Sequence, residues 1–219
     1  MYEVTKGLIA HWVGEGRVFA ANAGTITAPI TMGAGSIDST EPDLDVAVRP
    51  GTIIVPLSIL VVMETFGTTL LWEGMAAVGC GATGARTGGT LIDPVNLRTD
   101  SPRLSALRGG SLASQGVASN VDASGATYQT INIHEFWRYG ANKVVDIGTA
   151  IDTSTDVRTE RYWSILSDPA APHVKALDAT NLGRLNVYSG SQAGTGFIIL
   201  KFAEFRDDEY EHYFPNKLA

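Results

Sequence analysis

Apolar and polar residues follow the two-residue period of β-strands along most of the chain. The clearest case is Asp43 to Val48, where Leu44, Val46 and Val48 share one face. Nowhere does an apolar period of 3.6 residues persist over three turns, so the pattern predicts little helix. Further β-like segments are Thr25 to Met32, Thr52 to Phe66, Thr68 to Val78, Thr127 to Trp137, Glu160 to Leu166, His173 to Leu177, Arg184 to Tyr188 and Gly196 to Phe205.

The joins between these segments indicate how the strands are arranged. Thr68 to Val78 follows its predecessor after Gly67, a hairpin-like join, and a loop rich in Gly and Ser connects the last two strands. Pro56, inside the long segment Thr52 to Phe66, predicts an edge position, a bulge or a break. About eight to ten strands with sparse helix favour an all-β fold, an antiparallel jelly-roll or β-sandwich.

We divide the chain into three parts. Residues 1–40 are an N-terminal arm and first strand region, residues 41–206 the β-sandwich, and residues 207–219 an acidic-aromatic C-terminal arm. The sandwich includes a long irregular loop insertion, residues 79–125, with at most a helical turn or two around Arg103 to Arg108. Loops of this length in a compact domain are usually functional or ordered by a partner.

The insertion begins with G-C-G-A-T-G, residues 79–84, which matches the glycine fingerprint of dinucleotide-binding folds. The fingerprint has physical meaning only when a strand feeds the loop and a helix leaves it. A predicted strand precedes it, but Gly88, Gly89, Pro94 and Pro102 follow too closely for a helix. We therefore expect a loop between strands, with no nucleotide or other cofactor.

Charge and composition argue against several classes of partner. The chain has 219 residues, a net charge of -7 and no basic run, which argues against direct nucleic-acid binding. Charged residues make up only 18%, and a surface of small neutral residues suits a chain packed against neighbours. The longest apolar run, Ile53 to Met63, is too short to span a bilayer. His11, Glu15 and Arg17 interrupt the apolar start that a signal peptide would need.

The ionisable residues predict no catalytic or metal site. The four histidines are scattered, and Arg138 stands where an H-E-x-x-H motif beginning at His134 would need its second histidine. The single cysteine, Cys80, excludes an intrachain disulfide. Four acidic residues lie at the start of the strand predicted at Asp43. They lack the residue order of the known calcium-binding loop, so we favour solvated side chains at the start of the strand over a calcium site. The residues are Asp38, Glu41, Asp43 and Asp45.

Aromatic residues near the C-terminus are candidates for contact with another protein. The stretch "RDDEYEHYF", residues 206–214, is acidic and aromatic. It is either a solvated terminus or an arm that docks Tyr210, Tyr213 and Phe214 on a neighbour, since aromatic residues supply much of interface energy. Trp137, at the end of a predicted strand, is a further candidate.

The stretch "PVNLRTDSP", residues 94–102, is predicted to be an ordered contact loop, because its two prolines restrict the backbone. If the stretch is extended, Asn96, Arg98 and Asp100 share one side. We expect Arg98 to anchor an interface through its planar guanidinium; the alternative is a surface pair with Asp100 that contributes little. The other side, toward the domain or a neighbour, would carry Val95, Leu97 and Thr99.

Three stretches occur in an order that resembles small β-sandwich proteins of tailed bacteriophages, the head decoration (cement) proteins. They are "GGTLIDPVNLRTDSPRLS" from Gly88 to Ser105, the later "HEFWRYG", and the closing "LNVYSGSQAGTGFIILKFAEF". The resemblance covers Thr52 to Phe205. It implies a homotrimer of jelly-roll subunits on the virion surface, bridging neighbouring major capsid proteins of an icosahedral shell, without catalytic residues.

Two other classes of function stay open beside a non-enzymatic decoration protein. One is a carbohydrate- or receptor-binding β module of a phage tail or fibre, and the other is a jelly-roll enzyme without its usual histidines. A fibre head should follow a stalk, and the chain shows no heptads or shaft repeats before its domain. An enzyme should show clustered ionisable residues. Both observations favour decoration.

Overall fold

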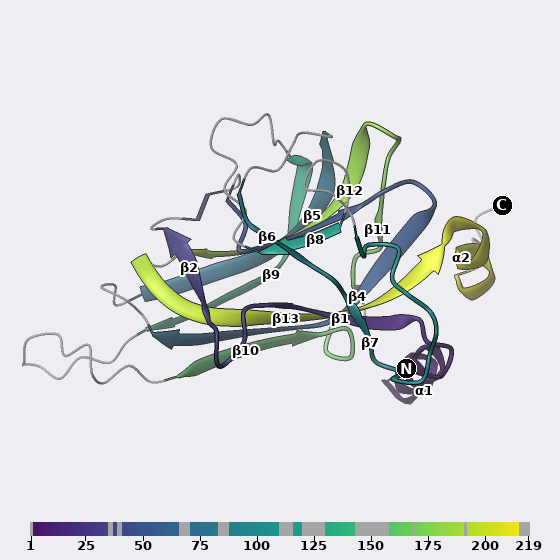
Figure 1. The fold of residues 1–219 in the computed structure, drawn as a ribbon, viewed down its shortest axis with the longest axis horizontal. Coiled ribbons are helices and arrows are strands. Elements are labelled where there is room, and N and C mark those ends of the chain that lie inside the picture. Colours follow the sequence, from purple (N-terminus) through teal and green to yellow (C-terminus); the bar gives the residue numbers. More distant parts are fainter. Residues whose placement is uncertain are drawn as a thin grey trace, which may run out of the picture.

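The computed structural model describes residues 2–34, 37–38, 41–65, 71–82, 88–109, 116–119, 130–142, 158–168, 170–190 and 192–214. Two antiparallel sheets enclose one apolar core, and both helices lie at one end of the molecule (Figure 1). The prediction of an all-β sandwich with little helix is confirmed.

The first sheet has seven strands, in the order β10, β4, β13, β1 and β7, with β11 joined to β4 and β2 joined to β13. The long strands β4 and β13 form its centre and pair over most of their length. Its strands are β1 (Val18–Ala23), β2 (Ile30–Ala34), β4 (Thr52–Thr65), β7 (Val95–Asn96), β10 (Thr159–Ser164), β11 (Val174–Lys175) and β13 (Gln192–Arg206).

The second sheet has six strands, in the order β6, β8, β3, β12, β5 and β9. At its centre the buried Asp45 accepts a hydrogen bond from the amide of Asn186 at 2.8 Å and pairs with Arg184 at 3.1 Å. A slip in register between β3 and β12 would separate these buried polar groups, which is strongly unfavourable. The strands are β3 (Leu44–Val48), β5 (Leu71–Ala82), β6 (Thr90–Ile92), β8 (Gly116–Ser119), β9 (Thr130–Asn142) and β12 (Asn181–Gly190).

Eight of these strands make a jelly roll. One sheet contains the order β1-β13-β4-β10 and the other the order β3-β12-β5-β9, so the first strand pairs with the last and strands nest inward in two Greek keys. Consecutive strands often lie in different sheets in this topology. The hairpin-like join after Gly67 is therefore a wrong prediction, because β4 and β5 belong to opposite sheets. An alternating pattern reveals a strand but not its partner.

Pro56 lies at a β-bulge rather than at an edge or a break. The register between β4 and β13 shifts between Lys201 and Phe202, and Leu57 is the extra residue of β4. On the other side of β4, β11 and β10 pair before and after this stretch. A proline, which cannot donate to a ladder, is tolerated at such an interruption.

The N-terminal arm and first strand region, residues 1–40, begins with a helix, α1 (Tyr2–Gly14), which the sequence pattern did not indicate. The side chains of α1 that pack against the core lie between Leu8 and Val13, less than two helical turns. The sequence therefore shows no apolar period of 3.6 residues over three turns. The strand predicted at Thr25 to Met32 begins only at Ile30, since Thr25 and Ala28 form an isolated bridge. The side chains of α1 that pack against the core are Leu8, Ile9, Trp12 and Val13.

The prediction of an irregular loop at residues 79–125 is wrong for part of the described chain. β5 continues to Ala82, and the connection from β5 to β9 adds β6, β7 and β8. β7 pairs with β1 and β8 pairs with β3, so this connection covers the edge of the sandwich opposite β9 and β10. Strands of two to four residues are too short to show a two-residue period in the sequence.

Candidate interaction site

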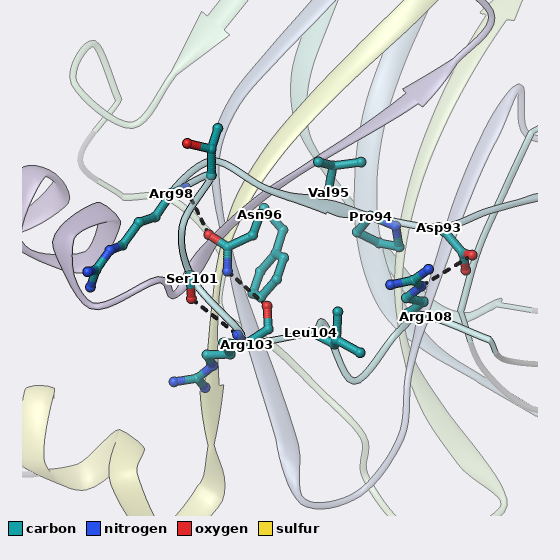
Figure 2. Close-up of a pocket in the computed structure, with 11 residues that line it drawn as sticks. Asp93, Pro94, Val95, Asn96, Arg98, Ser101, Arg103, Leu104 and Arg108 are labelled. Carbon is teal, nitrogen blue, oxygen red and sulfur yellow. Dashed lines mark hydrogen bonds and ion pairs between the residues drawn. The ribbon is translucent and has the colours of Figure 1, made fainter.

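Residues 88–109, here called the insertion surface, lie beside β1 and β8, since β7 pairs with β1 and β6 pairs with β8. Residues 93–108 form a loop of two arms, which are bridged twice (Figure 2). Arg108 donates to the Asp93 carboxylate at one bridge, and Asn96 donates to the carbonyl of Arg103 at the other. The predicted contact segment, residues 94–102, is therefore the first arm and the turn of this loop.

Glu204 of β13 holds the second arm. Its side chain is buried, and its carboxylate accepts hydrogen bonds from the Ser105 hydroxyl at 2.7 Å and the Ala106 N–H at 3.0 Å. The Ser105 hydroxyl oxygen accepts from the N–H of Leu107, whose side chain is buried in the core. Hydrogen bonds to a buried carboxylate are strong, so this contact fixes the arm on the domain.

Asn96 holds the first arm from inside. Its amide donates to the carbonyls of Gly16 at 2.8 Å and Arg103 at 3.1 Å, and its Oδ1 accepts from the N–H of Arg98 at 2.9 Å. Gly16 has a φ of 70°, and a Cβ atom there would lie 2.3 Å from Oγ of Ser101. Only glycine permits this close approach between the loop and the end of α1.

Arg98 uses its guanidinium within the chain. Nε and Nη2 donate to the carboxylate of Asp100 at 2.8 and 3.2 Å, and Nη1 donates to the carbonyl of Gly14 at 2.6 Å. The hydrogen bond and charge of Arg98 lower the pKa of Asp100. The pairing that we gave as the alternative to an interface anchor is the arrangement present here.

Apolar side chains of the insertion surface point to solvent. Val95 and Leu104 are 67% and 65% exposed. The alternation predicted for residues 94–102 holds only as far as Leu97. Asn96 bonds into the protein while Val95 and Leu97 face outward. Arg98 and Asp100 are exposed instead of sharing the side of Asn96. β7 has only two residues, after which the chain turns. Four of the eight exposed large apolar side chains among the described residues lie here: Leu91, Val95, Leu97 and Leu104.

A hollow of about 330 Å³ opens between the two arms of the loop. Figure 2 shows Pro94 and Asn96 on one side and Leu104 on the other, with the Asp93–Arg108 pair at one end. The hollow is therefore lined by apolar and charged side chains together, with Arg108 at the end beside Asp93. Its lining includes the apolar residues Phe19, Pro94, Val95 and Leu104 and the arginines Arg98, Arg103 and Arg108.

The C-terminal helix, α2 (Asp207–Tyr213), packs on its own chain. The ring centroid of Phe214 lies 5.8 Å from that of Trp12 and 4.8 Å from that of Tyr210. Tyr210 hydrogen-bonds Nδ1 of His173 through its hydroxyl. The three aromatic candidates Tyr210, Tyr213 and Phe214 thus serve an intramolecular contact, which differs from both a solvated terminus and an arm docked on a neighbour.

Arg17 connects α1 with α2. It donates to Glu15 at 2.7 Å and to Glu209 at 2.6 Å, and the Tyr213 hydroxyl donates to Glu15 at 2.8 Å. Burial alone would raise the pKa of Glu15, but the hydrogen bonds from Tyr213 and Arg17 outweigh it and lower that pKa. A hydrogen bond from Arg17 lowers the pKa of Glu209 in the same way. Ionised carboxylates therefore hold α2 in place.

Trp137 is not part of the insertion surface. It lies on β9 at the opposite edge of the second sheet, half-buried against the core, with its ring centroid 4.5 Å from that of Tyr139. The structure therefore brings together Asn96, Arg98 and Asp100 but places the aromatic candidates elsewhere.

Asp43 lies at the opposite end of β13 from Glu204, and its predicted solvated position is wrong. Its side chain is 4% exposed, its Oδ1 accepts from the N–H of Gly33 at 2.9 Å, and its Oδ2 has no partner in hydrogen-bonding geometry. Burial raises the pKa of Asp43 to about 7, and the hydrogen-bonding groups of Gly33 and Ser189 lower it only in part. Burial also raises the pKa of the nearby Tyr139 hydroxyl.

The glycine fingerprint begins as a strand. Residues 79–82 belong to β5 and pair with β12, so the predicted loop is wrong there. The described chain resumes at Gly88 and leads into β6 rather than into a helix. Among the described residues, no three His, Cys, Asp or Glu side chains form a group that could hold a metal ion. The part of the chain that is described contains no helix long and apolar enough to cross a membrane.

No family model matches the chain, and a search among curated proteins finds no relative.

The contact that the sequence pattern did not predict is the one made by Glu204. A single glutamate in the apolar segment Gly196 to Phe205 looks like an ordinary solvent-facing strand residue. Nothing in the local pattern reveals that a loop 98 and 99 residues away covers it.

Proposed function

We propose that the chain is a non-enzymatic virion structural protein, a capsid decoration protein that binds the major capsid protein shell and stabilises it as a homotrimer. The observation that carries the proposal is the insertion surface. Hydrogen bonds fix it to the sandwich, yet Val95, Leu97 and Leu104 face solvent. Clustered exposed apolar side chains mark sites of protein contact, and a rigid support lowers the entropy lost on binding.

The fold is compatible with this role but does not carry it. Jelly rolls serve as viral capsid domains, lectins and cupin enzymes, so function has to be argued from the site. Cupin chemistry requires clustered metal ligands, and the described residues contain no such cluster. The insertion surface offers contact with another protein instead.

Assembly on a shell suits the modest size of this surface. Each copy contributes few exposed apolar side chains, but a trimer seated on a symmetric shell engages several sites at once. Linked binding events raise the overall affinity without any additional contact per copy. Weak single contacts can therefore produce stable decoration.

Co-sedimentation with empty shells of the phage that encodes the chain tests this proposal. We expect the purified protein to sediment with the shells, and to have about three times the mass of one chain in solution. Val95→Glu should reduce binding, while the matched change Ile26→Glu, at a side chain 60% exposed outside the insertion surface, should not. Protein that stays in the supernatant, or equal loss in both variants, would contradict the proposal.

A further inference from the structure

We infer that the hollow between the two arms of residues 93–108 is a socket for one apolar side chain carried on an acidic segment of the partner protein. The inference rests on the proposed function in one respect, namely that the insertion surface contacts another protein. It goes further by stating which chemistry the partner must present.

The size and lining of the hollow favour a side chain over a larger ligand. Its volume of about 330 Å³ lies at the lower limit of ligand pockets, which span roughly 300–1,000 Å³. Pro94 and Leu104 give it apolar walls, and Val95 lines it from the first arm with its side chain turned away from Leu104 (Figure 2). Val95 and Leu104 are largely exposed. An apolar group from a partner would remove these side chains from water, which is the main source of affinity at such contacts.

The charges around the hollow select an acidic neighbour for that side chain. Three arginines line it against one aspartate, Asp93, whereas the whole chain has a net charge of -7. Arg98 is held by Asp100 and Gly14, whereas the contacts of Arg103 and Arg108 with the described residues are long. Nη2 of Arg103 lies 3.5 Å from the carbonyl of Glu204 and 3.8 Å from the Glu209 carboxylate. Nε of Arg108 lies 3.4 Å from Asp93.

Guanidinium groups held this loosely retain donors for a further carboxylate. Arginine has five N–H donors in a planar fork that matches carboxylate geometry, and the contacts that Arg103 and Arg108 make with the described residues use few of them. A carboxylate beside the inserted side chain would find them at the mouth of the hollow. Complementary charge there also disfavours a basic segment, so the socket discriminates between partners.

The hollow is preformed, which makes a single-side-chain contact effective. Glu204 holds the second arm through Ser105 and Ala106, and Asn96 holds the first arm through Gly16 and Arg103. Ordering a loop costs free energy on binding, and here the chain has already ordered it.

Peptide titration followed by NMR tests the socket without any shell. The probe is a capped peptide, Asp-Asp-Trp-Asp-Asp, added to isotope-labelled full-length protein. We expect saturable shifts confined to residues around Val95, Leu104 and Arg108. A peptide with alanine in place of tryptophan should lose these shifts, and one with lysines in place of the aspartates should bind at least about tenfold more weakly.

Leu104→Glu provides the decisive variant, because Leu104 is exposed and its replacement leaves the core unchanged. This substitution should weaken binding of the peptide about tenfold or more, as expected when a side chain that contacts the inserted anchor residue is lost. The matched control is Leu177→Glu, at a leucine that is 73% exposed. Leu177 lies next to β11, and the strands β4, β13 and β1 lie between β11 and β7 in the sheet. Arg108→Glu, which leaves the apolar side chains of the hollow in the sequence, should weaken binding of the acidic peptide and strengthen binding of the lysine peptide.

Three results would overturn the socket: no shifts around the hollow, equal binding of the acidic and lysine peptides, or equal losses in Leu104→Glu and Leu177→Glu. Shifts explained by a second copy of the chain, seen as dilution-dependent signals without peptide, would also overturn it. If the peptide does not bind the hollow, the protein can still sediment with shells. If the protein does not sediment with shells, the peptide titration still tests the hollow. The two proposals can therefore fail separately.

Discussion

The two ends of β13 each lie beside a buried carboxylate, and the two carboxylates are treated differently. At the C-terminal end, both oxygens of Glu204 accept hydrogen bonds from the insertion surface, next to α1 and α2 (Figure 1). At the N-terminal end, where β2 pairs with β13, Asp43 accepts from Gly33 through Oδ1 and has no partner for Oδ2. Both side chains are 4% exposed, so burial alone does not distinguish them.

The two ends of β13 therefore differ in how their buried carboxylates are hydrogen-bonded and in how they respond to protons. The end with the fully bonded carboxylate supports the exposed apolar side chains of the insertion surface. The other end keeps a buried carboxyl whose charge is costly, because an ion that leaves water needs compensating hydrogen bonds. The following changes test this difference, beginning with the largest expected effect.

Asp43 should make the free energy of unfolding depend on pH. Burial raises its pKa from 3.8 to about 7 in the folded protein, so the folded state holds a proton that the unfolded chain has released. This stabilisation is complete below about pH 4 and is lost as the pH rises through 7. Between pH 5 and pH 8 we expect a loss of about 3 kcal/mol, measured by urea unfolding at each pH.

Asp43→Asn is the control for this pH dependence, because it keeps the shape of the side chain and removes its titration. Glu15 and Glu209, whose pKa values are lowered, change stability in the opposite direction and only in acid below their ordinary value of 4.5. Burial also lowers the pKa of His173, so this histidine makes stability rise with pH within the same range, opposite to Asp43. The difference in slope between the unmodified protein and Asp43→Asn therefore isolates Asp43. A variant with the same slope as the unmodified protein would show that another group titrates.

Glu204→Ala should destabilise the end that carries the insertion surface. The substitution leaves the Ser105 hydroxyl and the Ala106 N–H without their buried acceptor, which costs about 2 kcal/mol. The insertion surface should become accessible to proteases under native conditions. Glu135→Ala, at a solvent-facing pair with Arg138, should change the free energy of unfolding by less than about 0.5 kcal/mol. Equal effects would mean that Glu204 does not hold the loop.

Phe214→Ala should affect stability but not docking. Phe214 is half-buried against Trp12 and Tyr210, so we expect a loss of about 1.5 kcal/mol, half the cost of a fully buried phenylalanine. Shell binding of the folded variant should remain at its normal level. Leu104→Ala should show the reverse, with stability unchanged within about 0.5 kcal/mol and weaker shell binding. Loss of docking in Phe214→Ala would restore α2 as a contact arm.

Arg98→Ala should have the smallest effect. Its guanidinium is exposed and paired with Asp100, so urea unfolding should show no measurable change. Shell binding should fall less than in Leu104→Glu, because Arg98 already uses its donors within the chain. A loss of binding as large as that of Leu104→Glu would instead make Arg98 an anchor.

The strands were predictable because long strands carry their own signal. β4, β12 and β13 are rich in apolar and β-branched residues, and their bounds agree with the sequence pattern within a few residues. The jelly-roll class followed from the number of strands and the scarcity of helix. Sheet partners did not follow, because pairing depends on contacts distant in sequence.

The candidate site was predictable only in part. The prolines at positions 94 and 102 indicated an ordered loop, but the outward turn of Val95 depends on Asn96 reaching Gly16, 80 residues away. The contact of Phe214, at the end of α2, with Trp12 in α1 could not be predicted, because it joins the two ends of the sequence. The burial of Asp43 likewise depends on Gly33 and Ser189, which no local pattern connects with it.

The proposed role as a decoration protein is tested most directly by electron microscopy of virions that carry this chain, at a resolution that allows the chain to be traced. We expect jelly-roll subunits on the outside of the shell, with residues 88–109 against the major capsid protein and an apolar side chain of that protein between Pro94 and Leu104. A subunit whose insertion surface faces solvent would contradict this role.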